Sequence, residues 1–403
     1  TIANFTMPAQ SMGPLAGTAP LQILVGLQLQ NSTQLGSLIR AVNTPGTSSY
    51  DKFLTPSEFN ATYAPLSSQV QAVESYLKQM GFTNISAPAN NLYVTADGTA
   101  AAAEQAFNTP IWQYQVSGPN GEPTRTVYAN TQRAEVPTYL ANAVVSVVGL
   151  ENIDTMHTEL GTWPAAAPSA VPAQGAPANP ITFTPQDFWK VYDVGGLPPA
   201  ANTTIAIIAE GNLAGVLPND LRQFESENKL PQVPYQIIQT GIASNDTSGD
   251  VEWDMDTQES SGMAGNLKEL LVYDASSLSD TDLIPAFNRY ITDDQAVAAS
   301  ASFGGCETLE YLSGAMQIYD TMYSQMAAQG QTQFASSGDS GSACGVVGLT
   351  NGVPLSGAPG AVEYPASSAY VMGAGGTSLV VDSNYNVIQE TSWDAGGGGS
   401  SLW

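Results

Sequence analysis

The second half of the chain alternates between short apolar runs and segments in which apolar positions have helical spacing. The short runs have strand length and are rich in β-branched and small residues, whereas the helical segments repeat apolar residues three and four positions apart. Strands interleaved with helices predict a parallel sheet whose functional loops gather at the carboxyl ends of its strands. The expected strands are 204–209, 270–273, 296–303 and 333–336, and the expected helices are 217–230, 282–291 and 310–329.

The first half is mixed rather than alternating. It contains a strand pattern at 21–29, helical spacing at 33–42 and 68–80, and a further strand near 92–95. We expect a compact α+β unit there. An Ala/Pro-rich stretch follows and predicts an extended linker. The expected organisation is therefore a first domain at 1–152, a linker at 153–180 and a second domain at 181–403.

The charge of the chain is strongly acidic and unevenly distributed. The 403 residues include 10 Lys and Arg, 36 Asp and Glu and a single His, which gives a net charge of −26. Residues 1–150 carry 5 basic and 7 acidic side chains, and residues 151–403 carry 5 and 29. This balance argues against nucleic acid or anionic membranes as partners. It favours an acidic habitat, where many of the carboxylates are neutral.

Several features are compatible with export. No apolar run reaches the roughly 18 residues of a transmembrane helix, so we expect no membrane span. The two cysteines, Cys306 and Cys344, permit one disulfide, and we expect it to form in a secreted, extracellular protein. Glycosylation sequons occur at Asn4, Asn31, Asn60, Asn84, Asn202 and Asn245.

The most informative candidate for chemistry is a pair of carboxylates at Glu252 and Asp256. Residues four apart on a helix share one face, so the two side chains can share a proton. A histidine would be protonated in acid, whereas such a pair can still accept a proton there. The alternative interpretation is an acidic, solvated helix face. A second candidate, Asp339, lies in a Gly-rich turn that directly follows the expected strand at 333–336.

Three motifs carry a family resemblance. The segments 252–258, 300–304 and 336–341 resemble, in order and rough spacing, the motifs of the sedolisins, the serine-carboxyl peptidases. The first half, with Leu54-Thr55-Pro56 and its closing segment 136–152, resembles the activation prodomain of that family. The resemblance implies an α/β, subtilisin-like parallel-sheet peptidase domain, C-terminally incomplete in this chain, preceded by an α+β, ferredoxin-like prodomain.

The resemblance also implies roles for individual residues. Glu252 would be the general base, Asp256 would orient and polarise it, and a protonated Asp339 would donate a hydrogen bond in the oxyanion hole. A bridge between Cys306 and Cys344 would brace the two motif turns. Substrate backbone would be bound by Ser300, Ser302 and Gly304.

One departure from the family pattern concerns the nucleophile. The family's Gly-Thr-Ser motif lies beyond a Gly-rich segment that here runs 396–399, so we expect the nucleophilic serine beyond residue 403. Ser378, in a similar tripeptide, matches an upstream structural strand of the family instead. We expect no cofactor or metal in this chain, and calcium in the part of the family fold that follows it. The aspartates Asp280, Asp282, Asp293 and Asp294 are expected in solvated loops and helix caps.

These observations predict a secreted, acid-acting peptidase precursor. Its substrates would be proteins or peptides, its prodomain would be its inhibitor, and a C-terminal chain from the same precursor is a possible partner. Acid would loosen the prodomain as ionised carboxylates lose their hydrogen bonds. The alternative from another class is an inactive sedolisin-like subunit with a binding or assembly role. If 338–341 were the nucleophile turn of a chymotrypsin-like protease, His157 would be the only histidine available as the base. If it were an aspartic-protease loop, a homodimer would have to supply the second copy of that loop.

Overall fold

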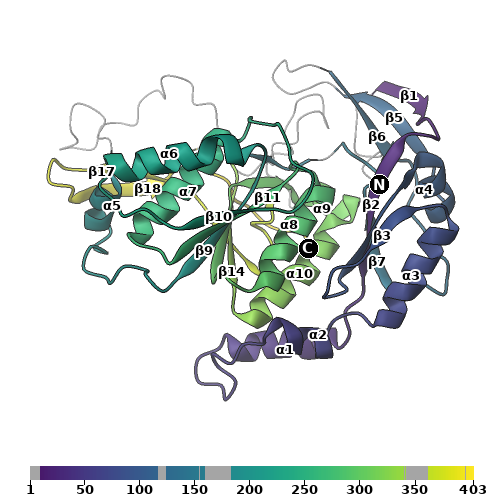
Figure 1. The fold of residues 1–403 in the computed structure, drawn as a ribbon, viewed down its shortest axis with the longest axis horizontal. Coiled ribbons are helices and arrows are strands. Elements are labelled where there is room, and N and C mark those ends of the chain that lie inside the picture. Colours follow the sequence, from purple (N-terminus) through teal and green to yellow (C-terminus); the bar gives the residue numbers. More distant parts are fainter. Residues whose placement is uncertain are drawn as a thin grey trace.

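The computed structural model describes residues 10–116, 124–153, 155–158, 183–339, 341, 362–394 and 396–403. Two domains lie side by side, the N-terminal one in purple to blue and the second in teal to yellow (Figure 1). Among the described residues, no helix combines the length and the apolar character needed to cross a membrane. The predicted linker at 153–180 falls almost entirely outside the described residues, so the domain limits stay a prediction.

The N-terminal domain has ferredoxin-like topology. Its antiparallel sheet has the order β3-β4-β2-β7, and two helices complete a βαββαβ unit. The predicted α+β class is confirmed. The unit consists of β2 (Pro20–Leu27), α3 (Ser67–Gln79), β3 (Thr83–Ser86), β4 (Tyr93–Thr99), α4 (Ala100–Phe107) and β7 (Val144–Val148).

Alternation along β2 directs its two faces to two different cores. Ile23 and Val25 pack into the domain's own core, whereas Leu24 belongs to the core of the second domain. Gly26, on the same face as Leu24, lies so close to the second domain that a β-carbon there would come within 2.6 Å of Ile318. The N-terminal sheet is therefore sandwiched between its own helices and the second domain.

The remaining N-terminal elements extend this unit. Helix α2 begins with an N-cap at Thr55, Pro56 in its first turn and a reciprocal capping box to Glu58. The capping explains why the Leu-Thr-Pro motif starts a helix. These elements are β1 (Gln10–Pro14), α1 (Ser32–Val42), α2 (Pro56–Thr62), β5 (Ile111–Val116) and β6 (Arg125–Asn130).

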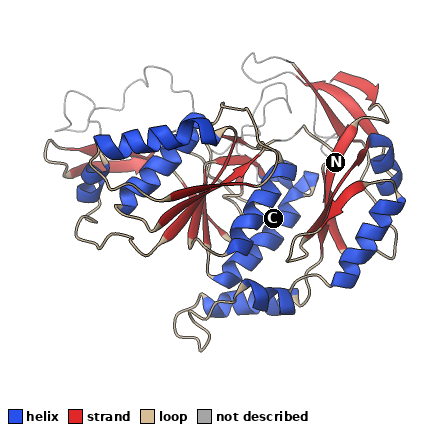
Figure 2. Ribbon diagram, in the orientation of Figure 1, coloured by secondary structure: helices blue, strands red, loops and turns tan. Residues whose placement is uncertain are grey.

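The second domain is built on six parallel strands with helices on both faces (Figure 2). The predicted α/β class is confirmed. The strands, in sheet order, are β10 (Tyr235–Gln239), β11 (Glu269–Ala275), β9 (Thr204–Glu210), β12 (Ala298–Ala301), β14 (Thr332–Ser336) and β16 (Val371–Ala374). The helices are α5 (Pro185–Val191), α6 (Leu213–Glu227), α7 (Asp250–Ala264), α8 (Asp280–Asp293), α9 (Glu307–Ser313) and α10 (Ala315–Gln329).

Two expected elements are divided in the structure. The strand predicted at 296–303 separates at Ser302 into β12 and β13 (Phe303–Cys306), which leaves the main sheet. The helix predicted at 310–329 is broken at Gly314, whose φ of 92° ends α9 and starts α10.

Strand β13 pairs antiparallel with β15 (Glu363–Tyr364) on one side and with β8 (His157–Thr158) on the other. An exposed hairpin follows, made of β17 (Thr377–Val381) and β18 (Val387–Ser392).

Candidate active site

The parallel sheet positions the candidate residues at one edge. Ser302 follows the carboxyl end of β12, Asp339 follows the neighbouring strand β14, and Glu252 lies in the first turn of α7. Helix α7 is held against β13 by Trp253, which is 1% exposed and meets the ring of Phe303 edge-on at 6.0 Å. The helical arrangement that the spacing of Glu252 and Asp256 requires is therefore present, and α7 is fixed to the strand that follows Ser302.

The two carboxyl groups of the pair meet at one hydroxyl. Ser302 donates a hydrogen bond from Oγ to Asp256 Oδ1 at 2.7 Å, and its hydroxyl lies close enough to Glu252 to oppose the rise in the pKa of that carboxyl. The structure therefore brings Glu252, Asp256 and Ser302 together. Ser302 was expected only to bind substrate backbone, and its contact with the pair is a feature that the sequence did not indicate.

Burial makes the pair hold protons tightly. Loss of solvation and the nearby charge of Asp256 raise the pKa of Glu252 to about 7, and the charge of Asp339 adds to this rise. Burial likewise raises the pKa of Asp256 to about 6, against the opposing effect of the Ser302 hydrogen bond. Glu252 Oε2 and Asp256 Oδ2 are buried and have no hydrogen-bond partner among the described residues. Each offers an acceptor to an incoming hydroxyl.

Asp339 lies within electrostatic range of Glu252, on a turn that glycines make possible. Gly338 has a φ of 96°, and a β-carbon there would come within 2.5 Å of Glu363 Cγ. The C-terminal glycine run packs on the same turn, where Ser337 Oγ donates to the carbonyl of Gly397 at 2.9 Å. A β-carbon at Gly397 would collide with the backbone of Ser337. Glycines in both segments thus allow the close approach beside Asp339.

The three residues expected to bind substrate backbone are placed differently. Ser300 lies inside the main sheet, in register with Ile207 on one side and Phe334 on the other, so it does not present a free strand edge. Gly304 lies in β13 and pairs with His157. Of the predicted set, Ser302 lies beside the carboxyl pair, Gly304 lies in β13, and Ser300 lies in the main sheet.

The pairing of His157 with β13 is a contact that the sequence did not indicate. From the sequence we expect a surface or junction residue, and His157 is exposed and lies in β8, which follows the N-terminal domain and pairs with β13. Part of its side chain reaches solvent, yet the protein around the imidazole lowers its pKa through burial. Its position as the single histidine of an acidic chain was a signal that could have drawn attention to it.

The other sequence candidates are resolved in part. Cys344 lies outside the described residues, so its pairing with Cys306 stays a prediction. Ser378 lies in the exposed hairpin strand β17, opposite Thr391. Among the described residues, no group of three or more His, Cys, Asp or Glu side chains could hold a metal ion. Asp280, expected to be solvated, is instead 8% exposed, because it is buried where the two domains meet.

The second domain thus combines a buried carboxyl pair with a neighbouring aspartate on a Gly-rich turn, and the N-terminal domain packs against it. Residues 9–153 match the family model "Pro-kumamolisin, activation domain". The chain is 39% identical to sedolisin of Pseudomonas sp. (strain 101), over 97% of this chain and 67% of that protein. It is 35% identical to xanthomonalisin of Xanthomonas sp. (strain T-22), over 94% of this chain and 47% of that protein.

One solved structure agrees with this assignment. The structure of Pseudomonas sedolisin, a serine-carboxyl proteinase complexed with two molecules of pseudo-iodotyrostatin, superposes with a TM-score of 0.50 and 36% identity. That similarity covers 55% of this chain and 63% of the solved chain. The chain belongs to the sedolisin family of serine-carboxyl peptidases, with an N-terminal activation prodomain. It spans about two thirds of the length of sedolisin and about half that of xanthomonalisin.

Proposed function

We propose that the complete protein is a secreted zymogen that hydrolyses peptide bonds in acid. This chain would supply the prodomain, the base pair Glu252 and Asp256, and the oxyanion group Asp339. The nucleophilic serine would lie beyond residue 403. The observation that carries the proposal is the cluster in which Ser302 joins the two buried carboxyls while each keeps one oxygen without a partner among the described residues.

The proposed chemistry follows from the placement of these groups. The serine hydroxyl would give its proton to Glu252 as its oxygen attacks the substrate carbonyl, and the proton would then pass to the leaving amine. Asp256 would stabilise the proton on Glu252 through their shared contact with Ser302. Asp339, protonated in acid, would donate a hydrogen bond to the developing oxyanion.

The raised pKa values set a condition on this chemistry. With pKa values of about 7 and 6, both Glu252 and Asp256 carry protons at about pH 4 in the covered state, so neither can act as base there. Removal of the covering chain would let water reach the pair and lower both pKa values. Exposure of the cleft would therefore switch on the base as well as admit substrate.

The proposed inhibitory contact is the strand β8. It occupies the edge of β13 by antiparallel pairing of His157 with Gly304 and of Thr158 with Phe303. An extended substrate peptide would use the same backbone groups, as in strand addition to a sheet edge. The prodomain would thus block the cleft with its own chain.

The test is to express the full-length gene and measure peptide hydrolysis from about pH 3 to pH 8. We expect Glu252→Gln to reduce kcat/KM by a factor of about 10² or more, because the base is lost. The exposed Glu227→Gln is the matched control and should leave kcat/KM unchanged. Asp339→Asn keeps a hydrogen-bond donor that does not depend on pH, so its activity should extend further toward neutral pH than that of the parent.

Two results would count against the proposal. Full activity of the Glu252→Gln variant would remove the base assignment. A full-length protein that binds peptides but hydrolyses none at any pH would instead favour the inactive binding subunit.

A further inference from the structure

A turn of the prodomain inserts a polar side chain into the second domain. The turn joins β3 to β4 and is closed by a hydrogen bond from the N–H of Asn91 to the carbonyl of Pro88 at 2.9 Å. Leu92 and Tyr93, which follow the turn, pack into the core of the second domain. Asn90, at the corner of the turn, is fully buried. The apolar residues thus hold the turn in the contact and bury Asn90 there.

One nitrogen of Asn90 is held between two helices of the second domain. Its Nδ2 atom donates to Asn288 Oδ1 of α8 at 2.8 Å and to Gln325 Oε1 of α10 at 2.9 Å. Asn288 is 4% exposed, and Gln325 is fully buried. A carboxamide nitrogen carries two protons, so each acceptor receives one of them. The two helices therefore form a site that fits the nitrogen end of a carboxamide.

The second domain itself determines that Gln325 presents an acceptor to the prodomain. The carbonyl of Ile291 can only accept a hydrogen bond, and Gln329 Nε2 donates to it at 2.8 Å. Gln329 therefore turns its oxygen toward Gln325, whose Nε2 donates to Gln329 Oε1 at 2.7 Å. The other polar atom of Gln325, its Oε1, is left to face Asn90. The polarity of the site is thus fixed from within the second domain.

Side chains of similar size without an amide nitrogen do not match this polarity. An aspartate at position 90 would have the shape of asparagine but would place carboxylate oxygens against two acceptors. A leucine would leave both buried acceptors without a donor, which costs more than an ordinary hydrogen bond contributes. The site therefore discriminates by chemistry among side chains that would fill the same space.

Other described contacts between the domains are less selective. Leu54 N–H donates to the carbonyl of Ala328 at 2.9 Å, and Met156 N–H donates to that of Leu278 at 3.2 Å. These bonds join backbone groups, which every residue except proline can supply as donor and acceptor. Apolar contacts, such as that of Leu24 with the core of the second domain, tolerate apolar replacements of similar volume.

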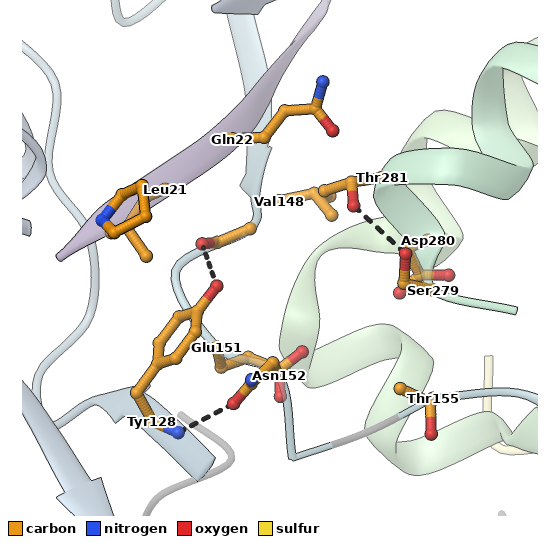
Figure 3. Close-up of a pocket in the computed structure, with 12 residues that line it drawn as sticks. Leu21, Gln22, Tyr128, Val148, Glu151, Asn152, Thr155, Ser279, Asp280 and Thr281 are labelled. Carbon is orange, nitrogen blue, oxygen red and sulfur yellow. Dashed lines mark hydrogen bonds between the residues drawn. The ribbon is translucent and has the colours of Figure 1, made fainter. Parts of the chain in front are cut away.

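The polar residues around the cavity between the domains also do not pair across it. This cavity of about 230 Å³ lies between Gln22 and Asn152 of the prodomain and Ser279 and Thr281 of the second domain. The hydrogen bonds drawn there each join residues of one domain, as between Tyr128 and Asn152 or between Ser279 and Thr281 (Figure 3). Selective side-chain recognition is therefore concentrated at Asn90.

We propose that Asn288 and Gln325 form a carboxamide-recognition site through which the peptidase domain selects its own prodomain, with Asn90 as the group recognised. A prodomain that carries another side chain of similar size at position 90 is then released faster. The inference rests on the proposed zymogen function, in which the prodomain stays bound until the chain is cut. Its test measures release rather than hydrolysis, so a failure of the peptidase function is distinguishable from a failure of the recognition site.

The test is to immobilise the full chain by a C-terminal tag, with the site of a sequence-specific protease inserted within 159–182. The protease is then added, and biolayer interferometry records how fast the N-terminal fragment dissociates. We expect Asn90→Asp to raise the dissociation rate at pH 7 by a factor of about 10² or more, because both acceptors lose their donor and a charge is buried. Asn90→Leu adds no charge and should raise the rate by a factor of about 10 or more.

The next residue of the same turn provides the matched control. Asn91 also donates from Nδ2, but to the carbonyl of Pro65 at 3.0 Å within the prodomain. Asn91→Asp makes the same chemical change outside the recognition site. Its dissociation rate should therefore stay close to that of the parent chain.

A double-mutant cycle shows whether Asn90 acts through the site. Asn288→Leu removes one acceptor, so adding Asn90→Leu to that variant should raise the dissociation rate by a smaller factor than it does in the parent chain. If Asn90→Asp does not fold, Asn90→Leu and this cycle decide the outcome. Equal release of the Asn90→Asp and Asn91→Asp variants, or factors that simply multiply in the cycle, would overturn the proposal.

Discussion

Replacement of Glu252 by Gln is the most informative single perturbation of this chain, because its effect on stability can be measured without the nucleophilic serine. Glu252 is 3% exposed, and burial together with the charge of Asp256 raises its pKa from 4.5 to about 7. In an unfolded chain the carboxyl group would ionise at its ordinary pKa. The folded state therefore binds more protons between those two values, and its stability falls as pH rises through them.

The size of the effect follows from the shift. Each unit of pKa difference corresponds to about 1.4 kcal/mol, and allowing for partial solvation we expect ionised Glu252 to cost the fold about 2–3 kcal/mol. Glutamine has nearly the same shape and no charge. Above about pH 7 the Glu252→Gln variant should be more stable by that amount, whereas below about pH 4.5 the difference should vanish.

Calorimetry of the purified chain at about pH 4 and pH 8 measures this difference. For a domain of about 200 residues, 2–3 kcal/mol corresponds to an increase in Tm of about 5–10 °C at the higher pH. Glu227→Gln, an exposed substitution of the same type, corrects for the general loss of negative charge. An equal change in Tm at both pH values, or a loss of stability at pH 8, would refute the reasoning from burial.

Three further predictions concern packing. Gly26→Ala should weaken docking of the prodomain, because the new β-carbon would come within 2.6 Å of Ile318. Gly36→Ala is the control, since only the end of the Arg40 side chain lies near that position. The resistance of the full chain to proteases compares the two variants. Asn90→Ala leaves two buried amide acceptors without a donor and should lower the unfolding free energy by about 2–3 kcal/mol in urea titrations, equally at pH 4 and pH 7. Gly397→Ala should detach the C-terminal segment from the turn beside Asp339, seen as faster amide hydrogen exchange at 396–398, and unchanged exchange there would contradict the close approach.

The sequence predicted the parts of the fold that depend on local pattern. Apolar runs such as 204–209 and 270–273 became central parallel strands, because strands buried on both faces are apolar throughout. The break at Gly314 and the departure of β13 from the sheet at Ser302 were not predicted. Ala301 and Phe303, on either side of Ser302, are buried in the same core, so the hydrophobic pattern does not mark that break. Gly314 separates Leu309, in the cluster with Cys306, from Ala315 in the main core, and both are apolar.

The candidate site was predictable in composition but not in its connections. Spacing placed Glu252 and Asp256 on one helical face, since both lie in α7. The bridging hydroxyl of Ser302 comes from a segment 46 residues further along the chain, and the pairing of His157 with Gly304 spans more than a hundred residues. Such contacts depend on the sheet order and on the docking of two domains, neither of which is encoded in local periodicity.

The acidic composition and the buried carboxyl groups have a common physical consequence. With 10 Lys and Arg against 36 Asp and Glu, most carboxylates have no cation to pair with, and the described residues contain only the ion pairs Arg222–Glu225 and Arg289–Asp293. A buried carboxyl group without a cation is stable chiefly in its protonated form. Glu210 and Asp274, at the ends of adjacent strands, show this, because burial raises the pKa of each to about 7. The pair Glu252 and Asp256 likewise becomes less favourable as its protons are lost. We therefore expect the folded state to be most stable in acid, which is where the proposed activity requires it.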